Sequence, residues 1–134
     1  MTVMVTLSGC TLESFEVEPC SSNGTVGFRI HKIDGWFRDY QPRPHRVLVR
    51  TRSGPGSAYP GVWSTDLKYY SDRDNGFDTR RARTHILYGQ PIAGWDIDKA
   101  PQRLVHGAIY GVVIDDGGHG GWATFVAGTR LPRC

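Results

Sequence analysis

Several short segments alternate between apolar and polar residues, the pattern of a strand with one buried and one solvent-facing side. Residues 25–33 place Val26, Phe28 and Ile30 on one face, with Arg29 and His31 on the other. The same period of two occurs in residues 11–18, where glutamates alternate with apolar residues, and in residues 45–52. We therefore expect three strands here, each with a core face and a polar face.

The strongest structural signal lies in residues 103–128, which have the pattern of a buried hairpin. Residues 104–114 are apolar or small except for His106, and residues 122–127 are again apolar, with β-branched and aromatic side chains. The polar, glycine-dense residues 115–121 separate the two arms. This predicts that the arms form the centre of the core and that the tip is an unusually long loop.

The other segments give weaker signals. We expect a first strand in residues 1–7, a strand followed by a loop in residues 62–70, and a short strand in residues 84–88. A single helical turn is predicted around residues 96–100, because Pro101 would stop it. Gly, Pro and polar residues predict loops in residues 53–61 and 71–83, and the tail from residue 128 to 134 is predicted to be irregular.

These elements predict one all-β domain spanning residues 1–134, with one or two short helical turns at most. A chain of 134 residues fits a single domain with its own core. About eight strands joined by turns favour an antiparallel sandwich or barrel. The longest apolar runs are shorter than eighteen residues, so the sequence predicts no membrane span.

The three cysteines are Cys10, Cys20 and Cys134. Because three is an odd number, at most one bridge forms, which favours a reducing cytoplasm or a virion over a secreted disulfide scaffold. Cys10 and Cys20 would meet if a hairpin closes between them. Leu7-Ser8-Gly9-Cys10 matches the pattern before a lipid-modified cysteine, but no Lys or Arg precedes it, and we favour a strand instead.

Charge is distributed unevenly along the chain. The formal net charge is +3, and residues 1–20 contain three glutamates and no Lys or Arg, so residues 21–134 carry +6. Candidate residues for binding nucleic acid or another anion are Arg46, Arg50 and Arg52 on one strand face and Arg80, Arg81 and Arg83 on the polar loop. The alternative is that alternating arginines only solvate an outer sheet face. Whether Arg29, Arg50 and Arg81 converge depends on the strand order.

The hairpin tip contains the candidate catalytic residues. His119 is a possible general acid or base, and Asp115 and Asp116 place two carboxylates within five residues of it. The alternative is an ordinary polar reversal. The sequence contains no phosphate-binding loop or nucleophile elbow, and we predict no metal or cofactor.

Three functions remain as hypotheses. The first is a non-enzymatic binding or assembly module, such as a subunit of a phage or bacterial complex, with a protein partner or a homo-oligomer. The second is a small ribonuclease-like phosphodiesterase that uses His119 together with an arginine cluster. The third is a nucleic-acid-binding domain with an arginine and aromatic face. The first leads, because the sequence shows no complete catalytic constellation.

Overall fold

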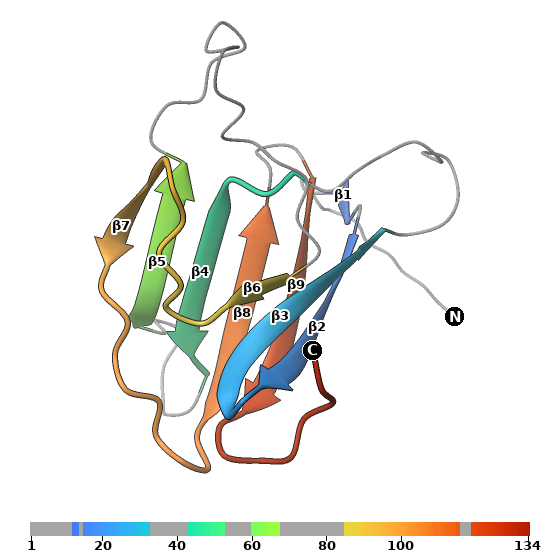
Figure 1. Cartoon of the computed structure of the whole chain (residues 1–134), viewed down its shortest axis with the longest axis vertical. Coiled ribbons are helices and arrows are strands. Elements are labelled where there is room, and N and C mark those ends of the chain that lie inside the picture. The colour runs from blue at the N-terminus through green and yellow to red at the C-terminus, as the bar shows by residue number, and fades with distance from the viewer. Residues whose placement is uncertain (1–11, 14, 33–42, 53–59, 68–84, 116–118) are drawn as a thin grey trace, which may run out of the picture.

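A computed structural model describes residues 12–13, 15–32, 43–52, 60–67, 85–115 and 119–134 of the chain (Figure 1). These residues form nine strands and contain no helix. The strands are β1 (Leu12–Glu13), β2 (Phe15–Ser22), β3 (Thr25–Lys32), β4 (Arg46–Thr51), β5 (Gly61–Leu67), β6 (His85–Leu87), β7 (Trp95–Lys99), β8 (Ile109–Asp115) and β9 (His119–Val126). The predictions for residues 1–7, 53–59 and 71–83 and for Cys10 lie outside the described residues.

The strands form two sheets that pack face to face. Sheet A has the order β1-β9-β8-β4-β5-β7, and sheet B has the order β2-β3-β6. Neighbouring strands are antiparallel except for β1 and β9, which pair in parallel. The fold is therefore an open β-sandwich, which confirms the all-β class and excludes the closed barrel.

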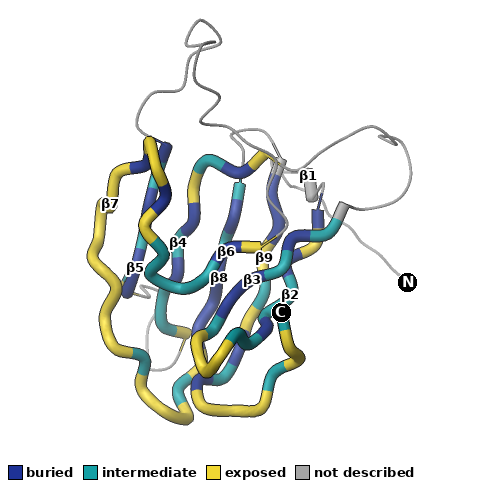
Figure 2. Tube along the Cα trace, in the orientation of Figure 1, coloured by how far each residue is buried: buried dark blue, intermediate teal, exposed yellow. Residues whose placement is uncertain are grey.

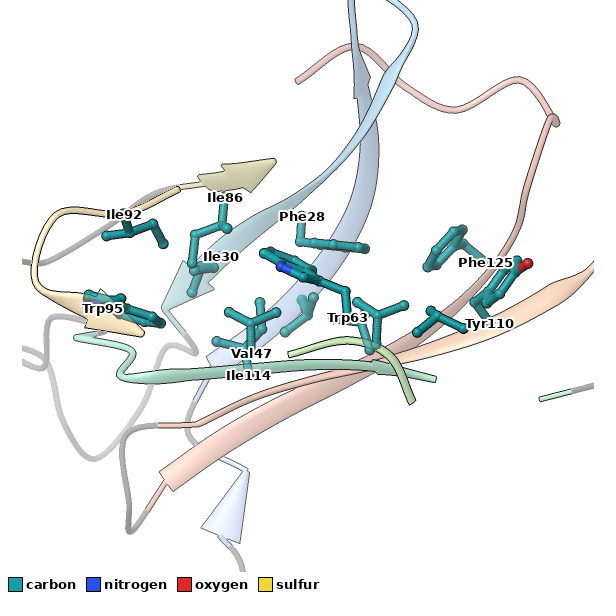
Figure 3. Packing of buried hydrophobic residues seen from close by; sticks show 14 of the residues in the cluster. Phe28, Ile30, Val47, Trp63, Ile86, Ile92, Trp95, Tyr110, Ile114 and Phe125 are labelled. Carbon is teal, nitrogen blue, oxygen red and sulfur yellow. The ribbon is translucent and has the colours of Figure 1, made fainter. Parts of the chain in front are cut away.

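The core lies between the sheets. The side chains of Phe15, Phe28, Trp63 and Ile86 are fully buried there, and Figure 3 shows Trp63 of sheet A below Phe28 of sheet B. The ring of Phe28 lies 5.6 Å from that of Phe125 on β9, so aromatic contacts join the two layers. Burial alternates along the central strands, whereas β7 and the turns are mostly exposed (Figure 2).

The first hairpin confirms the alternation read from the sequence. Phe15 and Val17 of β2 are buried, and Glu16 between them is exposed. Asn23 and Gly24 connect β2 to β3 with φ angles of 51° and 84°, the left-handed values of a two-residue hairpin turn. The strands pair from Ser22 with Thr25 onward, which places the basic residues of β3 on the outer face of sheet B.

The second hairpin, β8–β9, differs from the prediction at its tip. Strand β8 ends at Asp115 and β9 begins at His119, so only residues 116–118 lie between the strands, and the predicted long loop is wrong. The neighbouring glycines serve packing rather than the turn. A Cβ at Gly121 would collide with the backbone oxygen of Phe15, so glycine lets β2 approach β9 closely.

The arms of this hairpin are only partly the core that the sequence predicted. Strand β8 begins at Ile109, because the chain turns at Gly107, whose φ is 88°. In the preceding segment Val105 is 64% exposed. On β9, Phe125 is buried but Trp122 is 62% exposed, because the two residues point to opposite faces of sheet A.

The predicted helical turn around residues 96–100 is wrong. Residues Trp95–Lys99 form β7, which extends the edge of sheet A through pairs such as Leu67 with Trp95. A single helical turn is unstable by itself, whereas pairing with β5 satisfies backbone groups and buries the Trp95 indole.

The C-terminal tail is tied to β2. Cys20 and Cys134 form a disulfide, so Cys20 does not pair with Cys10. The Ser21 N–H donates to the Pro132 carbonyl at 2.7 Å, and the Cys134 N–H donates to the Ser21 carbonyl at 2.9 Å. This single bridge is the maximum that an odd count of three cysteines allows.

Candidate functional site

The outer face of sheet A, here called face A, contains the predicted arginine row. Along β4 the side chains of Val47 and Val49 are fully buried, and the alternating positions Arg46, Leu48 and Arg50 point outward. Arg52 follows the strand, and its N–H donates to the Ile109 carbonyl at 2.7 Å. The prediction that these three arginines share one face is therefore confirmed.

One end of face A is acidic. Arg46 forms an ion pair with Asp115, with its Nη2 3.0 Å and its Nε 3.1 Å from Oδ2. Arg46 also lies opposite Asp66 of β5, which in turn pairs with Asp96 of β7. Strand β7 also contributes Asp98, whose carboxyl forms a hydrogen bond with that of Asp66, so this end of the face is rich in carboxylates.

Asp66 is the perturbed titratable group at this end. Burial, together with the hydrogen bond and the like charge of Asp98, raises its pKa to about 6, against an opposing effect of Arg46. The Asp66 carboxyl therefore holds a proton in mildly acidic solution, while its unfolded counterpart is ionised. A perturbed pKa of this kind marks a candidate functional group.

The middle of face A is apolar. Leu48 pairs with Val113, and Val113 pairs with Trp122, so the three side chains form a row across β4, β8 and β9. Leu48 and Val113 are half-buried, and Trp122 is exposed. Exposed tryptophan in an apolar row is typical of a surface that another molecule covers.

The other end of face A is basic. Arg50 lies opposite Gly111 of β8, and a Cβ at Gly111 would lie 3.1 Å from Cδ of Arg52. Gly111 therefore leaves room for the Arg52 stem to lie across β8. Face A thus has an acidic end, an apolar middle and a basic end along the strand direction.

The outer face of sheet B, here called face B, contains a second polar cluster. Oε1 of Glu18 accepts hydrogen bonds from Nη1 of Arg29 and from Nε2 of His31, each at 3.3 Å. Arg29 pairs with Glu18 on one side and with His85 of β6 on the other. Ile86 is fully buried, so its neighbour His85 points outward onto face B.

The two faces do not meet. Arg29 belongs to sheet B and Arg50 to sheet A, and their side chains lie on opposite outer faces of the sandwich. The strand order therefore answers the open question for these two residues: Arg29 and Arg50 do not converge. Arg80, Arg81 and Arg83 lie outside the described residues.

The predicted catalytic tip is only partly described. The Asp115 carboxylate forms an ion pair with Arg46, and Asp116 lies outside the described residues. His119 is the first residue of β9, where its backbone lies opposite Leu12 of β1, and its side chain is not described. Among the described residues, no group of three His, Cys, Asp or Glu side chains is arranged to hold a metal ion, and no helix is long and apolar enough to cross a membrane.

Sequence reasoning missed Trp122 and Glu18 as surface candidates. Trp122 was assigned to a buried arm, although its alternation with Phe125 already places it on the outer face. Glu18 had no visible partner, because its contacts depend on the pairing of β2 with β3. The sequence matches no protein-family model, no curated protein and no solved structure. The candidate functional surfaces of the chain are therefore faces A and B.

Proposed function

We propose that the chain is an assembly module that binds a second copy of itself through face A. The observation that carries the proposal is the 62% exposure of Trp122 within the apolar row, between ends of opposite charge. Protein interfaces bury aromatic anchors at their centre and place charged groups at their rim. Face A has this arrangement.

Charge complementarity supports a second copy as the partner. A two-fold axis along the apolar row would place the acidic end of one copy on the basic end of the other. Arg50 and Arg52 of each copy would then face Asp66 and its neighbours in the other. The same axis brings Trp122 toward Trp122 of the second copy, so the apolar rows cover each other.

The balance of charge on face A favours a protein over nucleic acid. Among the described residues of this face, four are carboxylates and four are cations: Asp66, Asp96, Asp98 and Asp115, and Arg46, Arg50, Arg52 and Lys99. A phosphate backbone requires an excess of positive charge, since its affinity comes from neutralised phosphates. A face with equal and separated charges fits an oppositely oriented copy of itself.

Light scattering after size exclusion, together with sedimentation, tests the proposal. The full chain should form dimers or larger oligomers, and Trp122→Ser should weaken association by about 30-fold or more, the effect of losing an aromatic hot spot of about 2 kcal/mol. Val105→Ser is the matched control, because Val105 is equally exposed and lies in a turn before β8. A chain that stays monomeric, or an equal response of both variants, refutes the proposal.

A charge exchange tests the orientation. Arg50→Asp and Asp66→Lys should each impair self-association, because each places like charges against each other in the two-fold arrangement. Mixing the two variants should restore a mixed dimer, since the altered residues then face opposite charges. Failure of the mixture to associate, while each variant keeps its fold by circular dichroism, would exclude this arrangement.

A further inference from the structure

We infer that face B holds a second, independent site that binds a phosphodiester and cleaves RNA. The site is the cross-strand row of Glu18 on β2, Arg29 on β3 and His85 on β6. This row combines a carboxylate, a fixed cation and an imidazole, which are a general base, an anion-binding group and a general acid. It belongs to sheet B and makes no use of face A.

The order of the row suits in-line transfer at phosphorus. Neighbouring strands lie about 5 Å apart, so the Cα atoms of Glu18 and His85 are separated by about 10 Å, with Arg29 between them. A phosphate held by Arg29 would therefore have the base on one side and the acid on the other. In-line displacement requires this arrangement, because the entering and leaving oxygens occupy opposite sides of phosphorus.

Arg29 is held in place from two sides. Its Nη1 donates to Glu18, and its Nη2 donates to the backbone carbonyl of Arg133. The disulfide of Cys134 with Cys20 ties that part of the tail to β2. A guanidinium has five N–H donors, so further donors remain to bind phosphate oxygens.

One carboxylate oxygen of Glu18, Oε2, accepts no hydrogen bond from the described residues. Arg29 and His31 both donate to Oε1. The two bonds fix the orientation of the carboxylate. Oε2 is therefore the oxygen that accepts a proton from a substrate hydroxyl.

RNA supplies the nucleophile that this row lacks. The 2′-hydroxyl gives its proton to Glu18 as its oxygen forms a bond to phosphorus. The bond from phosphorus to the 5′-oxygen breaks, and that oxygen leaves with a proton from the His85 imidazolium. The products are a 2′,3′-cyclic phosphate and a 5′-hydroxyl, and Arg29 stabilises the charge on the phosphate oxygens during the transfer.

Incubation of the full-length, oxidised chain with a labelled single-stranded RNA oligonucleotide in EDTA tests the inference. We expect cleavage to cyclic phosphate ends and no cleavage of the DNA oligonucleotide of the same sequence, which lacks the 2′-hydroxyl. Glu18→Gln and His85→Gln should each lower the rate about 100-fold or more, the usual size of general acid–base catalysis. Glu16→Gln and His106→Gln are matched controls on exposed residues outside the row and should change the rate less than twofold.

Two results would overturn the inference: an absence of RNA cleavage by the parent chain, or cleavage that Glu18→Gln and His85→Gln leave unchanged. Thermal melting establishes that each variant folds. If Glu18→Gln does not fold, the cleavage rate of His85→Gln alone tests the inference. His85 is exposed and makes no side-chain contact in the cluster around Glu18, so its replacement should leave the fold intact. Trp122→Ser should retain full cleavage, which separates this test from that of assembly.

Discussion

Removing the Cys20–Cys134 disulfide should cost the fold a large part of its stability. The bridge joins residues 114 positions apart, so it closes a loop that spans most of the chain. The loss of loop-closure entropy in the unfolded chain is worth about 5 kcal/mol for a loop of this length, and measured effects are commonly about 2–4 kcal/mol. We therefore expect Cys134→Ser to lower the free energy of unfolding by about 4 kcal/mol. Cys134 is the better position to change, since Cys20 is fully buried.

The corresponding change in melting temperature follows from the size of the domain. An unfolding entropy of about 2.1 cal/mol/K per residue makes each 1 kcal/mol worth roughly 3–4 °C in a chain of 134 residues. The variant should therefore melt about 14 °C below the oxidised parent.

Urea unfolding followed by circular dichroism measures the effect directly. The parent should lose a similar amount of stability when reductant is added, whereas Cys134→Ser should respond little to reductant. Cys10→Ser is the control, because it removes a cysteine and keeps the bridge. A Cys134→Ser variant within about 1 kcal/mol of the oxidised parent would refute the entropic argument. The argument would also be refuted if reductant destabilised the Cys134→Ser variant as much as it destabilises the parent.

Three further predictions concern other parts of the sandwich. The folded-state pKa of Asp66, about 6, lies above its ordinary value of 3.8, so ionisation opposes folding as the pH rises from about 4 to above 6. Asp66→Asn should therefore stabilise the monomer at pH 8 by about 1 kcal/mol, a value reduced to allow for the screening of a partly exposed carboxylate by solvent, and should have little effect at pH 4. Equal effects of the substitution on urea unfolding at both pH values would contradict this prediction. Gly121→Ala should destabilise the fold by roughly 1–3 kcal/mol, because the new Cβ meets the Phe15 backbone. Thr124→Ala, on the outer side of β9, is the control and should change the free energy of unfolding by less than about 0.5 kcal/mol. Similar melting temperatures of the two variants would contradict the close approach of β2 to β9. Trp63→Ala should cost about 3–5 kcal/mol, since the fully buried indole also contacts the Tyr88 ring at 5.2 Å; a loss below about 1 kcal/mol would place Trp63 outside the core.

The sequence was most informative where a single strand decides the structure. Alternation in residues 25–33 identifies both the buried side of β3 and its basic side, because every second side chain points the same way. It failed where a distant strand decides. The pairing of β7 with β5 overrides a local helical turn, and Gly121 serves contact with Phe15 instead of the turn.

The candidate sites show the same division. The shared face of Arg46, Arg50 and Arg52 follows from their alternate spacing along β4 and into the residue after it. The row of Glu18, Arg29 and His85 involves three strands, and its members become neighbours only through the order of sheet B. The bridge between Cys20 and Cys134 likewise joins residues whose spacing in the sequence gives no sign of contact.

The position of the tail beside β2 also bears on how the protein behaves at high concentration. Strand β2 is an edge of sheet B, and an edge strand with unpaired backbone groups is a template for pairing with other chains. Pro132 and Cys134 occupy the backbone groups of Ser21 on that edge, and the covalent bond keeps them there. We therefore expect the disulfide to limit aggregation of the oxidised protein as well as unfolding, and we expect reducing conditions to weaken both effects together.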